Sequence, residues 1–194
     1  MPGIQIEGAR TGRVWDVTLR NMGRILGINL SPQHYTTQRD ALAFTLETTQ
    51  TPAGPSDYFF YLRNSSADRD LIITRIQADA ATAETVEAQF VTGTPAGGTS
   101  AGSPLSRNAG IGNTFQGVVE GGADITGLTD SGTFEKLFIP AGGEDEVNLL
   151  DRPIILPRGQ ATNIGMALLA TTGGISINAL VDVMIQTYDP AEGP

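Results

Sequence analysis

The stretch YFFYLRNSSADRDLIITRIQA, residues 58–78, holds two apolar runs separated by a short polar segment. The first run is aromatic and the second contains several isoleucines, which are side chains that β-strands favour. The residues between them, 64–70, are mostly Asn, Ser and Asp, which favour turns because their side chains bond to nearby backbone. The stretch therefore predicts two strands joined by a polar turn.

Apolar runs of this kind recur about every dozen residues along the chain, bounded by clusters of glycine and proline. Runs of about ten short strands without intervening helices are typical of a β-sandwich or jelly roll. We therefore expect an all-β, jelly-roll-like sandwich preceded by an extended N-terminal arm. Besides residues 58–63 and 71–78, the expected strands cover residues 13–19, 42–48, 84–93, 115–120, 132–140, 151–156, 163–170 and 175–188.

Four connecting segments carry more specific expectations. Residues 92–113 are rich in glycine and serine and predict a long loop. Residues 171–174, Thr-Thr-Gly-Gly, predict a hairpin turn between the last two strands, because glycine accepts positive φ. Short helical segments are conceivable at 79–87 and 144–149, although both are too short to be stable alone. Prolines flanking residues 154–156 favour an edge strand.

The charge of the chain changes near residue 40. Residues 1–40 hold five arginines against three acids, a net charge of +2, whereas residues 41–194 hold seven cations against 18 acids, a net charge of −11. Glycines and isolated apolar residues in the first part indicate an arm or first strands, and the rest forms the sandwich domain. A basic segment on an acidic body suggests docking on an acidic neighbour, and ordinary surface arginines on a first strand are the alternative.

Composition excludes several kinds of chemistry. Without cysteine, neither disulfides nor thiolate metal sites can form, and His34 is the only histidine, which disfavours zinc and a Ser-His-Asp triad. No Gly-Lys-Ser/Thr follows the glycine-rich stretch, so a P-loop is excluded. Residues 144–146 and 68–70 are acidic loops that could bind calcium, but the EF-hand spacing is missing and a solvated turn is the default interpretation. We therefore expect no enzyme activity, no cofactor and no metal.

Charge, hydropathy and arginine content limit the classes of partner that we expect. An acidic body disfavours nucleic acid, which needs concentrated positive charge. No apolar run approaches the roughly 20 residues of a membrane helix, and the first residues lack a leader pattern, so we expect synthesis in the cytoplasm and no membrane contact. Eleven arginines against one lysine suit packing against protein, because interfaces enrich arginine, although genomic base composition could also account for the bias.

The aromatic run at 58–61 predicts burial of both strand faces. Tyr58 and Phe60 share one face, and Phe59 and Tyr61 share the other. A neighbouring subunit or the chain's own long loop could cover the outer face. The residues that we select as candidates for an interface are Arg10, Arg13, Trp15, Arg20, Arg24, Tyr58 and Phe60.

Two stretches resemble structural proteins of tailed-phage virions. Residues 61–73 contain a strand ending in Arg-Asn, then a polar turn and an apolar strand, and residues 153–159 contain an apolar run followed by Pro-Arg-Gly before two final strands. The opening is also similar, with a glycine-rich, Arg-bearing segment before Asp40. The resemblance implies a capsid decoration (cement) protein, a β-sandwich oligomer, often a trimer, that clamps capsid subunits.

The expected function is accordingly structural. We expect a homo-oligomer, with a trimer favoured, that binds the major capsid protein or another virion protein and resides in the virion after synthesis in the host cytoplasm. Another virion component, such as a tail, fibre or adaptor subunit, is one alternative. A carbohydrate-binding or receptor-binding β-sandwich is the other, although sugar stacking usually draws on exposed aromatics and Trp15 is the only tryptophan.

Overall fold

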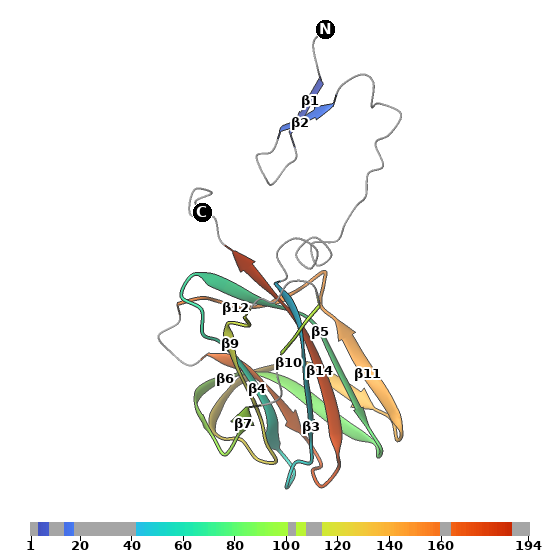
Figure 1. Ribbon diagram of the computed structural model, residues 1–194. Helices are drawn as coiled ribbons and strands as arrows, with labels where there is room; N and C mark the ends of the chain where they lie inside the picture. Colours follow the sequence, from blue (N-terminus) through green and yellow to red (C-terminus); the bar gives the residue numbers. More distant parts are fainter. Residues whose placement is uncertain are drawn as a thin grey trace. The chain divides into compact units, whose positions relative to one another are not determined.

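A computed structural model describes residues 4–7, 14–17, 42–100, 104–107, 114–159 and 164–187 (Figure 1). The chain divides into two compact units, Met1–Ser31 and Pro32–Pro194. In the first unit, β1 (Ile4–Glu7) pairs antiparallel with β2 (Val14–Val17), with Ile6 opposite Trp15. The remainder of the expected arm lies outside the described residues.

The second unit contains two antiparallel sheets. The first, here the β4 sheet, has the order β10 (Thr126–Ile139), β6 (Glu84–Ala96), β13 (Gly165–Ala170), β4 (Asp57–Asn64), β9 (Gly117–Gly121) and β7 (Thr99–Ser100). The second, here the β14 sheet, has the order β11 (Gly143–Asn148), β5 (Arg69–Ala80), β14 (Ile177–Thr187), β3 (Ala43–Gln50) and β8 (Leu105–Ser106), and β12 (Ile154–Leu156) also pairs with β5.

Eight strands define a jelly roll. Four of them run β3-β14-β5-β11 in one sheet, and the other four run β4-β13-β6-β10 in the facing sheet. Apart from the step from β6 to β10, each of these strands is followed along the chain by one in the opposite sheet. This is the arrangement that two interlocked Greek keys produce. The expected all-β sandwich is therefore confirmed, and no helix occurs among the described residues.

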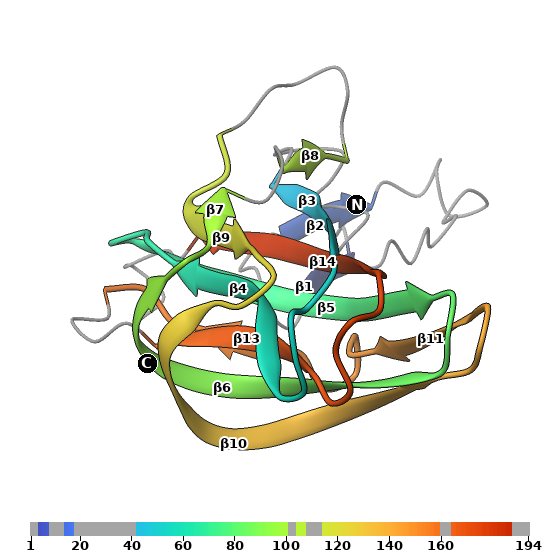
Figure 2. The same cartoon turned by 90° about the horizontal axis from the view of Figure 1, so that it is seen from below.

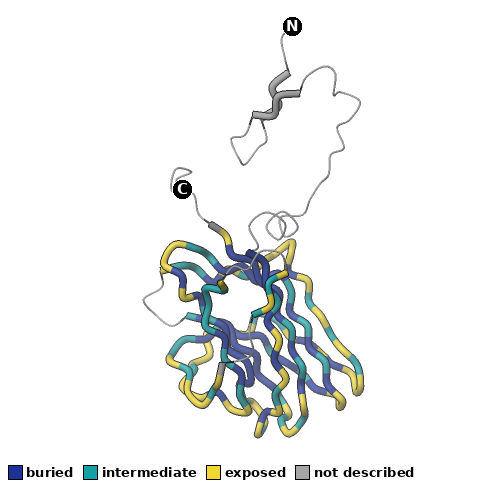
Figure 3. The backbone as a smooth tube through the Cα atoms, in the orientation of Figure 1, coloured by how far each residue is buried: buried dark blue, intermediate teal, exposed yellow. Residues whose placement is uncertain are grey.

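The core lies between the two sheets, as the dark blue segments of Figure 3 show. Each sheet contributes alternate residues, as expected for strands with one face buried. Phe115, which precedes β9, packs edge-on against Phe44 of β3, with ring centroids 5.4 Å apart. The largest wholly buried side chains of this core are Phe44, Leu46, Phe59, Phe60, Leu62, Leu71, Ile73, Ile76, Leu137 and Leu156.

Strands β6 and β10 bend strongly where they leave the sandwich (Figure 2). Their pairing shifts register at three places along β10. Gly93 (φ 111°) and Gly127 (φ 77°) lie within this curved part, and a Cβ on either would overlap a backbone carbonyl oxygen of the partner strand. Glycine is required here because it alone has no Cβ and adopts positive φ freely. The chain then returns through β7 and β9 to pair with β4.

Several connections differ from the sequence-based expectations. The stretch 92–113 contains the end of β6 together with β7 and β8, and residues 101–103 and 108–113 lie outside the described residues. The two helical candidates are wrong, because 79–87 spans the end of β5 and the start of β6, and 144–148 belongs to β11. Residues 171–174 do not close a hairpin, because β13 and β14 belong to different sheets, although Gly173 and Gly174 do have positive φ.

Candidate functional site

The aromatic run of β4 is buried on both faces by the chain itself. Phe59 and Phe60 both lie in the core between the sheets, since a register shift near Leu168 places two consecutive side chains inward. The expectation that Phe60 forms part of an interface is therefore wrong, because its exposed fraction is 0% within this chain.

A second, smaller core covers the other face of β4. It consists of Tyr61, Val91, Ile125 and Ala167, with Tyr58 and Leu128 packed at its border. The segment after β9 is held over this face by hydrogen bonds from the N–H of Gly122 to the carbonyl of Phe59 (3.2 Å) and from the N–H of Ile125 to that of Tyr58 (2.8 Å). Residues 122–128, here called the roof, supply the cover that a neighbouring subunit was one candidate to provide.

Tyr58 and Tyr61 differ in how their hydroxyls are satisfied. The Tyr58 hydroxyl donates to Oε1 of Gln89 at 2.8 Å. The Tyr61 hydroxyl is fully buried and has no hydrogen-bond partner within the described part of the chain, which is costly in an apolar surrounding. Burial raises the pKa of both phenols.

A polar network continues from Tyr58 across the β4 sheet to its edge. Gln89 donates to Glu87 at 2.9 Å, and Glu87 accepts from Nζ of Lys136 at 2.6 Å. The Lys136 hydrogen bond holds the pKa of the Glu87 carboxyl below its ordinary value. Tyr58 therefore lies at the inner end of a network that the chain itself satisfies.

Asn64 joins the β4 sheet to the β14 sheet at one corner of the sandwich. Its amide nitrogen donates to the carbonyls of Arg69 and Leu156, both at 2.8 Å. Its amide oxygen accepts the N–H of Ser66 at 2.9 Å, so both ends of the buried amide are bonded. The N–H of Gly159 in turn donates to the carbonyl of Ser66 at 3.0 Å.

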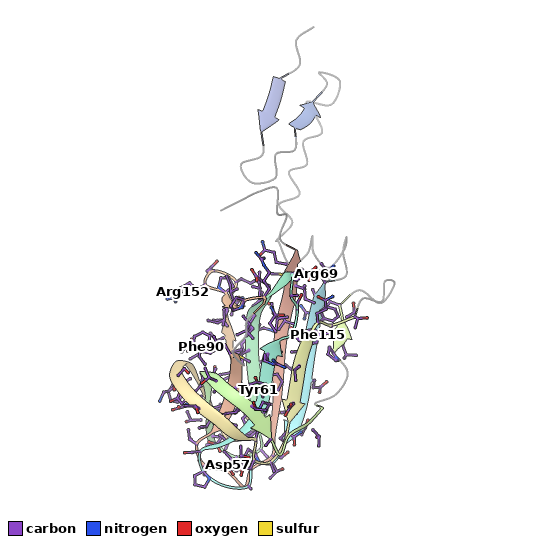
Figure 4. The ribbon with its side chains drawn as sticks, turned by 90° about the vertical axis from the view of Figure 1, so that its left-hand side faces the viewer. Asp57, Tyr61, Arg69, Phe90, Phe115 and Arg152 are labelled. Carbon is purple, nitrogen blue, oxygen red and sulfur yellow. The ribbon has the colours of Figure 1, made fainter. Side chains whose placement is uncertain are left out.

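This corner brings together the two stretches that carry the resemblance to virion proteins. Residues 61–73 supply the turn, and residues 153–159 supply the segment that is hydrogen-bonded to it. Arg158 completes the contact, because its N–H donates to Asp70 at 2.9 Å and its guanidinium lies 3.7 Å from the same carboxylate. Arg69 lies at this end of the sandwich together with Arg152, whereas Asp57 lies at the other end (Figure 4).

The outer face of the β14 sheet is organised around one buried carboxylate, Asp182. It accepts the Thr45 hydroxyl at 2.7 Å. It also pairs with Nε of Arg75 at 2.9 Å and Nη2 of Arg107 at 3.3 Å. The Asp182 side chain is 3% exposed, whereas those of Arg75 and Arg107 are 30% and 37% exposed. The two guanidiniums therefore shield a carboxylate that would be costly to bury alone.

Arg107 connects the segment after β8 to strands β3 and β14 of the sheet. It follows β8 in the long excursion between β6 and β10, and its Nε also donates to the Thr45 hydroxyl at 3.1 Å. The buried carboxylate thus ties the excursion to the sheet. A depression of about 210 Å³ lies beside the cluster, lined by Thr74, Arg75, Arg107, Asn148, Leu150 and Asp182. Both oxygens of Asp182 have partners: Oδ1 accepts from Thr45, and Oδ2 lies against Arg75 and Arg107. We call these four residues the Asp182 clamp.

Four acidic residues form what we call the acidic face of the β14 sheet: Glu47, Asp79, Glu144 and Glu146. Cross-strand pairing puts Glu146, Gln77, Leu180 and Glu47 in one row and Glu144, Asp79, Asn178 and Thr49 in the next. The three glutamates are exposed. The acidic turn expected at residues 144–146 is therefore strand β11, and two of its carboxylates join this face.

The remaining sequence-based candidates divide into two groups. Arg10, Arg13, Arg20 and Arg24 lie outside the described residues, and Trp15 is described only as a residue of β2. Within the described ranges, no group of three or more His, Asp or Glu residues is placed to hold a metal ion. No helix long and apolar enough to span a membrane occurs in these ranges either.

Comparisons with known proteins yielded no match, whether against protein-family models, curated proteins or solved structures. The functional argument consequently depends on residues and geometry. Sequence reasoning missed Asp182, although a signal exists: it is the one acid within the apolar strand at 177–187, at an outward position between Val181 and Val183.

Proposed function

We propose that this protein is a non-enzymatic structural subunit of a virus particle, of the capsid decoration type. It would bind and stabilise the phage head by forming oligomers and by exchanging its N-terminal segment between neighbours. The observation that carries the proposal is the Asn64 corner, where the two resemblance-bearing stretches form one hydrogen-bonded unit. The jelly roll is compatible with this role, since viral capsid domains often use it, but lectins use it as well.

Charge supports the assembly part of the proposal. The acidic face is exposed on the β14 sheet, and residues 1–40 of the same chain carry a net charge of +2. Arginine suits such contacts because its planar guanidinium bonds carboxylates in a bidentate manner. The Arg-bearing segment of one copy would therefore dock on the acidic face of another.

The test is the mass of the protein in solution, measured by light scattering at low and high salt. We expect an oligomer, a trimer being favoured, whose stability falls as salt screens the charges. Replacing Arg10, Arg13, Arg20 and Arg24 together by Gln should weaken it, as should deleting residues 1–36 while the sandwich stays folded. A clean monomer at both salt concentrations would contradict assembly through charge.

A second candidate, carbohydrate binding, is favoured by one observation. Phe138 is 66% exposed on β10, two residues from Lys136 and hence on the same face of its strand. An exposed ring beside polar groups can stack on a sugar. Titration with a panel of soluble oligosaccharides, using Phe138→Ser as the matched variant, distinguishes the two functions: binding lost in the variant would favour the second.

A further inference from the structure

The two strands of the first unit have one apolar face and one mostly polar face. In their antiparallel register, residues directly opposite each other share a face, and alternate residues of each strand share it too. One face therefore consists only of apolar residues, and we call it the β1–β2 apolar face: Ile4, Ile6, Trp15 and Val17. The other face has three polar residues, two of them acids, and one valine: Gln5, Glu7, Asp16 and Val14.

The β1–β2 apolar face needs a cover that the two strands cannot supply. Strands β1 and β2 form a sheet of two, and among the described strands each pairs only with the other. Each strand has four residues, and an isolated two-stranded hairpin is marginally stable at best in water. A sheet with an apolar face has to bury that face against another element. Another surface must therefore complete this unit.

The described surface of the sandwich does not match the β1–β2 apolar face. Its exposed large apolar side chains are dispersed, and Arg152 interrupts the sequence between the last two of them: Leu105 on β8, Phe138 on β10, Leu150 after β11 and Ile155 on β12. Charge disfavours the sandwich as well, because β1 and β2 hold two acids and no base, and residues 41–194 have a net charge of −11. Like charges that are brought together oppose docking.

A second copy of the chain presents a surface that does match. When two such apolar faces meet, Glu7 and Asp16 lie on the opposite faces, so the contact buries no carboxylate. Burial of two isoleucines, one valine and one tryptophan removes roughly 500 Å² per copy from water. Two faces together then bury about 1,000 Å², which reaches the size of a specific protein interface.

We infer that the β1–β2 apolar faces of different copies pack together and form a shared core of the oligomer. The inference rests on the proposed assembly and names a surface that performs it. In a trimer, three such pairs around one axis would bury all three faces. The shared core uses none of the arginines at positions 10, 13, 20 and 24, which lie outside both strands in the sequence and are the residues proposed to meet the acidic face.

The fluorescence of Trp15 provides the first test, because it is the only tryptophan and lies on this face. In the wild-type oligomer its emission should be blue-shifted and shielded from acrylamide. Dilution that lowers the mass measured by light scattering to that of a single chain, 20.4 kDa, should shift the emission to the red and expose Trp15 to the quencher. Mass and emission should change over the same range of concentration.

Two full-length variants then compare the two faces. Ile6→Asp places a carboxylate on the apolar face and should lower the mass to that of a single chain, with red-shifted Trp15 emission. Gln5→Asp places the same group one residue away on the opposite face, and this matched control should keep the wild-type mass and emission. Circular dichroism checks that the sandwich is folded, and the pair Ile6→Ser and Gln5→Ser replaces these variants if Ile6→Asp fails to fold.

Each outcome bears on the inference. An Ile6→Asp variant that keeps the wild-type mass would overturn it while leaving the oligomer, and with it the proposed function, intact. Emission that stays blue-shifted after dilution to single chains would show that the chain covers its own face. Free quenching of Trp15 within the oligomer would show that the face is reserved for a different partner, and either result would overturn the shared core. A wild type that is monomeric at every concentration would contradict the proposed assembly itself, and the inference with it.

Discussion

The outer faces of the two sheets differ in what covers them. On the β4 sheet, the roof closes over Tyr61 and creates a second apolar core within the same chain. On the β14 sheet, the corresponding face carries the Asp182 clamp and the acidic face, with exposed carboxylates in successive cross-strand rows. The β4 sheet is therefore buried on both sides beneath the roof, and the β14 sheet presents a charged surface.

The comparison shows which side chains each outer face leaves exposed. Under the roof, the apolar side chains on the outer side of the β4 sheet pack within the chain, whereas Phe138 of β10 remains 66% exposed on that side. The β14 sheet leaves Glu47, Glu144 and Glu146 exposed on its outer face, although Glu146 also pairs with Arg75 at 3.3 Å. The excursion between β6 and β10 produces both results, because it supplies the roof on one sheet and Arg107 on the other.

The largest effect should come from removing the centre of the roofed core. Tyr61→Ala should lower the free energy of unfolding by about 3–5 kcal/mol, because it leaves a cavity under Ile125. Chemical denaturation measures the change. Tyr61→Phe is the control, since it removes only a buried hydroxyl that has no hydrogen-bond partner among the described residues, and it should cost nothing or stabilise slightly. A loss below about 1 kcal/mol for the alanine variant would show that the roof is not a true core.

Breaking the Asp182 clamp should have an intermediate effect. Asp182→Asn should lower the free energy of unfolding by about 2 kcal/mol, less than the 3–5 kcal/mol of a fully buried pair, because both arginines reach solvent. A double-mutant cycle with Arg107→Gln isolates the Arg107 contact. Coupling indistinguishable from zero would mean that the excursion is not held by this carboxylate.

The Asn64 corner should respond to a similar degree. Asn64→Ala removes two donated bonds and one accepted bond at a buried site, and we expect a loss of about 2 kcal/mol. Asn64→Asp keeps the acceptor for Ser66 but cannot donate to Leu156. Equal denaturation midpoints for Asn64→Asp and wild type would show that the link to residues 153–159 contributes no stability.

The smallest effect on stability should come from the ion pair between Glu87 of β6 and Lys136 of β10. The lowered pKa of Glu87 means that its pairing with Lys136 stabilises the fold above the unfolded pKa of about 4.3, and that this contribution is lost as pH falls through the folded pKa. Glu87→Gln should cost below about 1 kcal/mol at pH 7. Thermal unfolding of both proteins from pH 7 to pH 3 should show the difference vanish at the acidic end.

Much of the fold was predictable from local pattern. All ten expected strands overlap observed ones, because alternation of apolar side chains directly reflects burial of one strand face. Strand β11 was missed because its sequence, Gly-Glu-Asp-Glu-Val-Asn, has almost no apolar residues, and its carboxylates gave the signal of a solvated turn. The edge position of β12 followed from its flanking prolines and is confirmed by its pairing with β5 alone.

The candidate site was less predictable, because it depends on contacts between residues far apart in the chain. Double-sided burial of residues 58–61 was evident from the sequence, but two covers were equally compatible with it. Only the structure shows that residues 122–128 of the same chain, through Ile125, cover the outer face of β4. Phe60 was misassigned for the same reason, because strict alternation cannot foresee the register shift that turns both Phe59 and Phe60 inward.

The sequence by itself determined an all-β chain with an acidic sandwich body and a basic first segment, since composition and two-residue periodicity are local properties. The tertiary structure alone decided that Asp182 meets Arg75 and Arg107, and that Asn64 meets Leu156, 92 residues away. Such pairs arise where strands distant in sequence become neighbours in a sheet. No local pattern encodes that neighbourhood, because it is set by the packing of the whole sandwich.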